Sequence, residues 1–229
     1  MNSSQQENCI LRSDNIHRGF STPQGRIEVL KGITLELERG EMVAVLGASG
    51  VGKTTLLHLL GGLDRPDEGD IYFHDKPYSS MSEAELAVFR NRHIGFIFQF
   101  HYLLSEFSAL ENVMMPLLIA GKSHPEASER AELLLDDVGL KDRISHLPAE
   151  LSGGEQQRVA VARALALEPD IVLADEPSGN LDVKTGHKLH ELLVELNNVK
   201  KTSFAIATHN LPLADLCGRV IHLSNGEKE

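Results

Sequence analysis

Short alternations of apolar and polar residues mark the amino-terminal part of the chain. They run between residues 10 and 37, for example at Ile33–Leu37, and the pattern returns at Gly69–Phe73. Turns at Gly25 and at Glu38–Glu41 separate the runs. A period of two predicts antiparallel strands with one face in water. We therefore expect an N-terminal antiparallel β subdomain.

A second group of predicted strands is apolar throughout, and helical patterns separate them. These strands are Met42–Leu46, Ile94–Phe98, Ile171–Ala174 and Ser203–Ala207, with helices expected at Thr55–Leu60 and near Val183–Val199. Continuous apolar strands alternating with helices are typical of a mainly parallel sheet covered on both faces. The predicted fold class is therefore α/β.

From Ser105 to Glu168 the pattern becomes helical. Ser123 and Glu126 form a capping-box motif, Pro125 suits a first helical turn, and Pro148 precedes a second helix. The sequence shows no internal repeat or flexible linker. We expect a single domain over residues 1–229, with a helical subdomain inserted at about 100–165 into one α/β core.

Charge and hydropathy restrict the partners. The formal net charge of the 229-residue chain is −11, which argues against nucleic acid as a partner because nucleic acid needs a basic face. No apolar run approaches the roughly 18 residues of a membrane-spanning helix. Cys9 and Cys217 are the only cysteines and form no metal-ligand cluster. Any membrane contact is expected to come through a partner.

The candidate chemistry begins directly after the strand Met42–Leu46. The residues there match G-x-x-x-x-G-K-[ST], a phosphate-binding loop: Gly47, Ala48, Ser49, Gly50, Val51, Gly52, Lys53 and Thr54. Backbone N–H groups of such a loop point at phosphate oxygens, and the following helix adds its positive dipole end. Lys53 can reach the β- and γ-phosphates, and the Thr54 hydroxyl can bind Mg²⁺. A strand before the loop and a helix after it are the context that the motif requires.

Two carboxylates follow the buried strand Ile171–Ala174. Ligands bind at the carboxyl edge of a parallel sheet, where Asp175 could hold Mg²⁺ and Glu176 could polarise a water for attack on the γ-phosphate. Taken alone, this acidic strand end is also common in other α/β proteins.

A second helix start carries an unusual pair of glycines. Ser152 and Glu155 form a capping box, yet Gly153 and Gly154 each cost about 1 kcal/mol of helix stability relative to alanine. Exposed N–H groups at a helix start attract anions. Since one phosphate cradle is already present, this start suggests a contact to the nucleotide of another subunit.

With these motifs, the sequence resembles the nucleotide-binding subunits of ATP-binding cassette (ABC) transporters. Leu151–Glu155 is similar to the family signature, and further family motifs follow in order over nearly the whole chain. The resemblance implies an adenine-stacking role for Phe20, a catalytic and Mg²⁺-binding role for Gln99, and a γ-phosphate contact for His209. It places Asp182, in the motif Ser178–Asp182, at a subunit interface. Individually, Phe20 could be a core residue, His209 a structural histidine and Asp182 a helix N-cap.

The resemblance implies a phosphate-loop ATPase with ATP and Mg²⁺ as cofactors. Two copies would form a homodimer in the ATP-bound state, each ATP lying between Gly47–Thr55 of one chain (Thr55 included) and Ser152–Glu155 of the other. Transmembrane permease subunits would hold the protein at the cytoplasmic face of the inner membrane. Soluble ABC ATPases that do not transport form an outside alternative.

The segment Phe98–Leu118 is similar to that of ATPases from bacterial lipoprotein-releasing systems, in a group that also includes macrolide-exporter and cell-division ATPases. This favours lipoprotein release and leaves export of macrolides or peptides, or a cell-division role, as alternatives. The segment is rich in large apolar residues: Phe100, Tyr102, Leu103, Leu104 and Phe107. They either fill the helical subdomain core or, as we predict for some of them, form a groove for a short helix of a membrane subunit.

Overall fold

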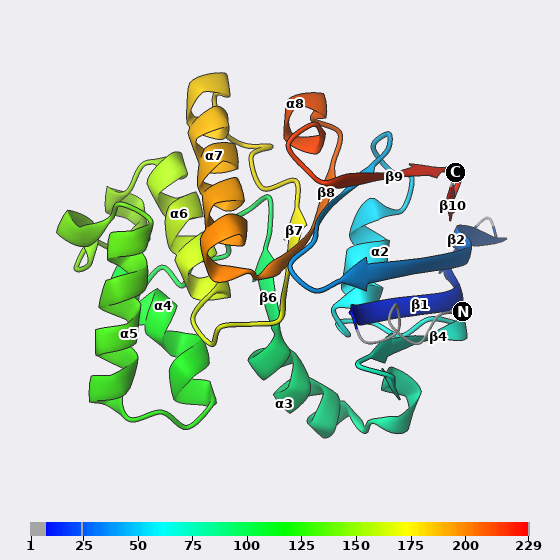
Figure 1. Ribbon diagram of the computed structural model, residues 1–229, viewed down its shortest axis with the longest axis horizontal. Helices are drawn as coiled ribbons and strands as arrows, with labels where there is room; N and C mark the ends of the chain where they lie inside the picture. Colours follow the sequence, from blue (N-terminus) through cyan, green and yellow to red (C-terminus); the bar gives the residue numbers. More distant parts are fainter. Residues whose placement is uncertain (1–7, 24, 229) are drawn as a thin grey trace.

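The computed structural model describes residues 8–23 and 25–228 and contains two β-sheets with helices around them (Figure 1). Every candidate site residue lies within these ranges, whereas residues 1–7, 24 and 229 of the expected domain lie outside them. The first sheet is antiparallel, with strand order β2-β1-β4-β5. Its strands are β1 (Cys9–Thr22), β2 (Gly25–Glu38), β4 (Glu68–Phe73) and β5 (Lys76–Pro77).

The second sheet has six strands in the order β10-β9-β3-β8-β7-β6. The pairs from β9 to β6 are parallel, and the edge strand β10 is antiparallel to β9. Its strands are β3 (Met42–Leu46), β6 (Ile94–Ile97), β7 (Ile171–Asp175), β8 (Ser203–Thr208), β9 (Arg219–Ser224) and β10 (Glu227–Lys228). The α/β prediction and the antiparallel N-terminal subdomain are confirmed.

Alternate residues of the central strands enter two separate hydrophobic cores. On β8, Phe204 and Ile206 belong to the core shared with α6 (Gly153–Ala164) and α7 (Val183–Lys200). Ala205 and Ala207 belong to the core shared with α2 (Lys53–Leu60) and the antiparallel sheet. Side chains of a strand point alternately to opposite faces. A strand buried on both faces must therefore be apolar at every position, which explains the continuous runs in the sequence. The helices outside the helical subdomain are α2 (Lys53–Leu60), α3 (Glu83–His93), α7 (Val183–Lys200) and α8 (Leu211–Ala214).

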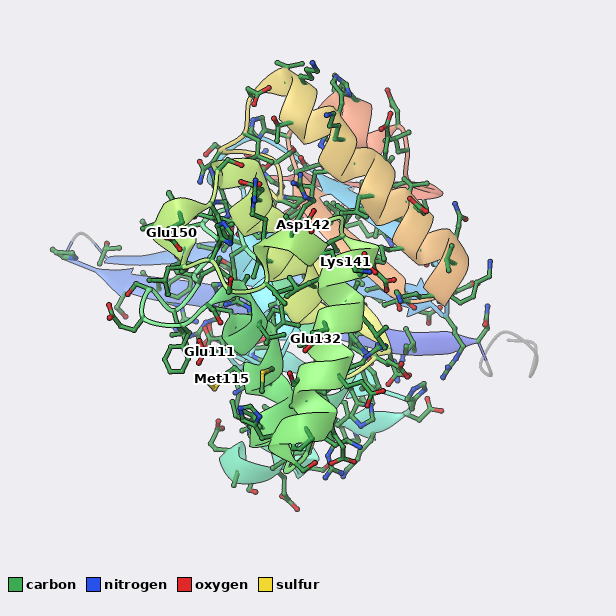
Figure 2. The ribbon with its side chains drawn as sticks, turned by 90° about the vertical axis from the view of Figure 1, so that its left-hand side faces the viewer. Glu111, Met115, Glu132, Lys141, Asp142 and Glu150 are labelled. Carbon is green, nitrogen blue, oxygen red and sulfur yellow. The ribbon has the colours of Figure 1, made fainter. Side chains whose placement is uncertain are left out.

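Three helices between β6 and β7 form the helical subdomain: α4 (Ala109–Ile119), α5 (His124–Asp137) and α6 (Gly153–Ala164). Capping boxes at Ser108, Ser123 and Ser152 start them. Figure 2 shows the outer face of this subdomain, where Glu132 of α5 and the following Lys141 and Asp142 are exposed. The apolar faces of α4, α5 and α6 pack against one another and continue into the core beneath α7.

Two helices were not predicted from the sequence, the short α8 and the longer α3. Leu86 is the only buried residue of α3 among those described, so no apolar stripe marks this helix. The capping box of Ser82 with Glu85 is the local signal that identifies it. Short 3₁₀ turns connect the remaining elements at Tyr78–Ser80, Lys141–Arg143 and Pro148–Glu150.

Candidate functional site

The phosphate-binding loop lies at the carboxyl edge of the six-stranded sheet, between β3 and α2. It lines a cavity of about 320 Å³ together with residues from three other segments: Val29 of β2, Gln99 after β6, and Asp175 and Glu176 at the end of β7. Gly52 caps α2 with φ = 110°, a conformation that L side chains rarely adopt. A Cβ at this position would also lie 2.9 Å from Leu30 Cδ2. Glycine is therefore required where the loop turns into the helix.

Lys53 is buried at the base of this cavity. Its Nζ donates to the carbonyl oxygens of Gly47 (2.8 Å) and Ala48 (3.1 Å) and lies 3.6 Å from Glu176 Oε1. The ammonium is thus held by the loop itself and points into the space that the loop encloses. Such a cation, beside backbone N–H groups at a helix start, is suited to binding phosphate.

Thr54 and Asp175 form the candidate Mg²⁺ site. The Thr54 hydroxyl donates to Asp175 Oδ2 at 2.7 Å, while Asp175 Oδ1 is buried without a hydrogen-bond partner. Burial raises the pKa of Asp175; the nearby Glu176 carboxylate adds to this rise and the Thr54 hydrogen bond opposes it. No group of three or more His, Cys, Asp or Glu side chains that could hold a metal occurs in the described ranges. One hydroxyl and one carboxylate fit Mg²⁺, which keeps waters and phosphate oxygens as its other ligands.

Glu176 and His209 are joined across neighbouring strands β7 and β8. His209 Nδ1 lies 2.7 Å from Glu176 Oε1, and because a carboxylate only accepts, Nδ1 carries the proton. Thr208 Oγ1 (3.0 Å) and the His209 backbone N–H (3.3 Å) donate to Oε2. Glu176 itself has φ = 45°, an uncommon conformation for a residue other than glycine. These contacts hold the carboxylate at the edge of the phosphate cavity.

Gln99 and Phe20, two further predicted nucleotide contacts, lie in different places relative to the phosphate cavity. Gln99 lines the cavity, and its amide Nε2 donates to Asn180 Oδ1 at 3.2 Å. Phe20 does not line it. Its side chain is 42% exposed on the β1–β2 hairpin that supplies Val29, and the Arg18 guanidinium lies 5.0 Å from its ring. In the strand register Phe20 pairs with the exposed Ile27, so the hairpin presents an apolar platform of two side chains.

None of the residues Ser152–Glu155 lines the chain's own phosphate cavity. Ser152 is the N-cap of α6, and Glu155 Oε2 accepts from the Ser152 backbone N–H (2.8 Å) and hydroxyl (2.7 Å). The other oxygen of Glu155 accepts from Arg143 at 3.3 Å. The hydrogen bonds from Ser152 and the Arg143 contact lower the pKa of Glu155, so the carboxylate stays ionised in the cap.

Close packing between α6 and α7 explains why glycine occupies position 154 despite its cost in helix stability. A Cβ at Gly154 would lie 2.4 Å from Thr185 Cγ2 on the first turn of α7, far inside contact distance. Gly153 has only Leu181 Cδ2 nearby, at 3.8 Å. Asp182 is the N-cap of α7 and accepts from the Thr185 backbone N–H at 3.1 Å, so the N-cap alternative for this residue is correct. The start of α6 and the loop before α7 therefore form one packed unit.

Sequence reasoning missed two residues of α6 that hold the segment after Gln99. Gln157 is fully buried, donates to the Phe98 carbonyl at 3.2 Å and contacts His101 Nδ1 through its Oε1. Arg163 donates to the carbonyls of Tyr102 and His101, each at 2.7 Å. The charge of Arg163 on an apolar helix face was the available signal. Both side chains connect the helix that begins at Ser152 to the segment Phe98–Tyr102.

The fold and the phosphate cavity define a phosphate-loop nucleoside triphosphatase. Comparison with known proteins narrows this class, because residues 30–179 match the family model described as "ABC transporter". The chain therefore belongs to the ABC transporter family and is an ATP-binding, ATP-hydrolysing subunit of that family.

Curated relatives match over nearly their whole length. The "Lipoprotein-releasing system ATP-binding protein LolD" of Syntrophus aciditrophicus is 55% identical over 95% of this chain and 98% of its own. The protein of the same name from Bacteroides fragilis is 54% identical over 91% and 96%. A solved ATP-binding cassette, MJ0796, described as a dimer in a post-hydrolysis state bound to ADP and Pi, superposes with a TM-score of 0.89 at 38% identity. That match covers 96% of this chain and 97% of the other.

Proposed function

We propose that this protein is the ATPase motor of a bacterial ABC complex that releases lipoproteins from the inner membrane. The observation that carries the proposal is the identity of about half the residues, over nearly complete chains, with ATPases named for lipoprotein release. The same chain would form a single nucleotide-binding domain with the helical subdomain as its insertion.

The site residues take roles that their contacts support. Gly47–Thr55 cradle the phosphates, Lys53 offsets phosphate charge, and Phe20 with Ile27 provides the surface for adenine. Thr54, Asp175 and Gln99 hold Mg²⁺, which when bound neutralises charge on the phosphates. Glu176, aligned by His209 and Thr208, accepts the proton of the attacking water.

The complete site requires two copies of the chain. Ser152, Gly153 and Gly154 do not line the chain's own cavity, which leaves the N–H groups of this helix start for the nucleotide of a partner copy. A symmetric head-to-tail pair would then contain two equivalent sites. Ser152→Arg tests this arrangement: ATP affinity of the isolated chain should stay within about twofold, while turnover should fall at least tenfold. Equal loss of both would contradict the shared site.

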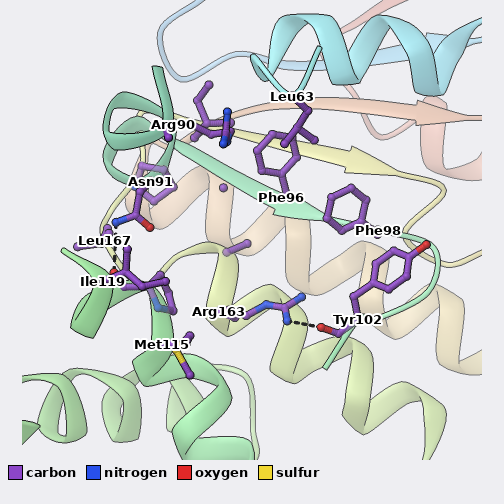
Figure 3. Close-up of a pocket in the computed structure, with 16 residues that line it drawn as sticks. Leu63, Arg90, Asn91, Phe96, Phe98, Tyr102, Met115, Ile119, Arg163 and Leu167 are labelled. Atoms are coloured by element: carbon purple, nitrogen blue, oxygen red, sulfur yellow. Dashed lines mark hydrogen bonds between the residues drawn. The ribbon is translucent and has the colours of Figure 1, made fainter. Parts of the chain in front are cut away.

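A groove between the α/β core and the helical subdomain is the proposed docking site for a permease subunit. Its cavity volume is about 560 Å³, and Figure 3 shows Phe98, Tyr102, Met115 and Ile119 along it. Tyr102 is 66% exposed, and Phe100, Leu104 and Phe107 are also exposed, whereas Leu103 packs against the core. Four of the five large apolar residues singled out in the segment Phe98–Leu118 are thus exposed and do not fill the core. A short amphipathic helix fits such a groove.

The charged residues of the groove also support its role as the docking site for a permease helix. Arg90 and Arg163 line the groove without an acidic lining residue, although Asp and Glu outnumber Lys and Arg in the chain, 33 to 22. Within the described ranges neither guanidinium has an ion-pair partner; Arg90 donates to the Gly62 carbonyl at 2.7 Å. A carboxylate on the docking helix would complement both. A permease docked in the groove would hold the ATPase at the cytoplasmic face of the membrane. No helix in the described part of the chain is itself long and apolar enough to cross a membrane.

The experiment is reconstitution. The protein would be purified with the membrane subunits of its complex and placed in liposomes that contain a lipoprotein. We expect ATP-dependent release of the lipoprotein into the aqueous phase and no release by the same complex carrying Glu176→Gln. An assembled, ATP-hydrolysing complex that exports a macrolide but leaves lipoprotein in the membrane would overturn the proposal.

A further inference from the structure

The loop Ser178–Asp182, here called the interface loop, connects the catalytic strand β7 to α7. It begins two residues after Glu176, and the Gly179 N–H donates back to the Glu176 carbonyl at 2.9 Å. Two hydrogen bonds join it to the segment after β6: Gln99 Nε2 to Asn180 Oδ1 (3.2 Å) and Asn180 Nδ2 to the Gln99 carbonyl (3.0 Å). Gly179, Asn180 and Asp182 are exposed. The loop is therefore anchored on one side while its outer edge faces solvent.

A buried histidine anchors the other side. His190, on the second turn of α7, is only 3% exposed, and its Nε2 lies 2.8 Å from the Ser178 hydroxyl. Its Nδ1 is buried and has no hydrogen-bond partner. Since a buried N–H without a partner is rarer than a buried acceptor without one, the proton belongs on Nε2 and is donated to Ser178 Oγ. The Ser178 hydroxyl keeps its own proton for a further donation.

The ring is neutral under ordinary conditions. Burial lowers the pKa of His190, and the adjacent imidazole of His187 lowers it further. An apolar side chain would fill this space without leaving a ring nitrogen unpaired, so packing alone does not account for a histidine here. The specific gain from the imidazole is the hydrogen bond to the interface loop.

We infer that His190 is a positioning residue, which sets the interface loop through Ser178 so that the two copies of the ATPase close productively over ATP. The inference rests on the two-copy site proposed above. A loop fixed at Ser178 holds the backbone from Glu176 to Asp182 in one conformation, and the start of α6 packs against the same unit through Thr185 and Leu181. Loss of the hydrogen bond would remove the side-chain anchor at Ser178, while the Asn180 hydrogen bonds to Gln99 remain. Closure and turnover would suffer, whereas ATP binding by one chain would not.

The test compares His190→Met, which fills the space without a hydrogen-bond donor, with His190→Gln, whose amide can still donate to Ser178. His187→Met, at an exposed position beside it, is the matched control. For each variant one would measure ATP affinity of the isolated chain, kcat and KM of the ATPase, and the melting temperature. Dimer formation with ATP would be measured by light scattering in a Glu176→Gln background.

We expect His190→Met to lower kcat and weaken the dimer by about tenfold, the size of one hydrogen bond, with single-chain ATP affinity unchanged. His190→Gln should recover most of the loss, and Ser178→Ala should match His190→Met without adding to it in the double variant. The inference is overturned if His190→Met turns over within twofold of wild type. It is equally overturned if His190→Gln fails to recover activity while both variants lose melting temperature alike, because His190 would then act through packing. Absence of an ATP dimer in the Glu176→Gln parent itself would instead refute the two-copy site.

Discussion

The imidazole of His209 donates through Nδ1 to Glu176 Oε1 at 2.7 Å, and this contact joins the ends of two adjacent parallel strands. Glu176 is largely buried while the His209 side chain is exposed, so the histidine covers the carboxylate from the solvent side. His209 itself does not line the phosphate cavity, and Nε2 makes no hydrogen bond to the described residues. We propose that the pair responds to the terminal phosphate of a bound nucleotide.

Glu176→Gln should retain ATP binding and lose turnover by at least about 100-fold, because an amide cannot accept the proton of the attacking water. ATP should accumulate in a dimer, which size-exclusion chromatography with light scattering would detect. Single-turnover hydrolysis at the wild-type rate would show that another group accepts the proton.

Lys53→Ala should weaken ATP binding by about 10- to 100-fold, since it removes a charge-assisted hydrogen bond to phosphate. Fluorescence titration with a labelled ATP analogue would measure the affinity. The exposed Lys188→Ala removes a charge on α7 and serves as the control. Equal affinities of Lys53→Ala and wild type would place the nucleotide elsewhere.

Gly154→Ala should lower the free energy of unfolding by about 1–3 kcal/mol, because the new methyl group overlaps Thr185 Cγ2 and pushes α6 away from α7. Thr185→Ser removes that methyl group and should restore most of the loss in the double variant. Gly153→Ala, with no atom closer than 3.8 Å, should change stability much less. Urea denaturation of wild type, the three single variants and the double variant measures these differences, and additive losses in the double variant would contradict the contact.

Tyr102→Glu should reduce co-purification with the membrane subunits at least tenfold, because it places a charge in the apolar groove. ATP hydrolysis by the soluble chain should persist. Val88→Glu introduces the same charge at an exposed position of α3 outside the groove lining and should assemble normally. If the Tyr102 variant assembles and transports like wild type, the permease docks on another surface.

Glu126→Gln should flatten the dependence of stability on pH in acid. Hydrogen bonds from Ser123 lower the pKa of Glu126 below its ordinary value of 4.5. A carboxyl group with a lowered folded-state pKa stabilises the protein above that ordinary value and loses this contribution as the pH falls through the folded-state pKa. Urea denaturation between about pH 3 and pH 7 should therefore show a steeper loss below about pH 4.5 for wild type than for the variant. Glu129→Gln, on the same helix outside the capping box, is the control, and parallel curves for wild type and Glu126→Gln would contradict the prediction.

Local sequence was sufficient for much of the fold and the nucleotide site. The phosphate-binding loop, the alternating strands near the amino terminus, the apolar parallel strands and the capping boxes at Ser123 and Ser152 all depend on residues a few positions apart. Such patterns predict local structure because capping hydrogen bonds and the side-chain period of a strand or helix involve residues that are close in sequence. Helix α3 has no apolar stripe, and for that reason it was not predicted from the sequence.

Tertiary structure decided the relationships between distant positions. The strand order β3-β8-β7 brings Glu176 beside His209, the packing of α7 against α6 makes Gly154 necessary, and the position of Ser178 over α7 gives His190 its partner. No local pattern encodes these contacts, because each depends on which surfaces meet when the two cores form. The sequence by itself determined the phosphate-loop motif and the strand and helix around it, and the packing of sheet and helices determined which side chains meet at that loop.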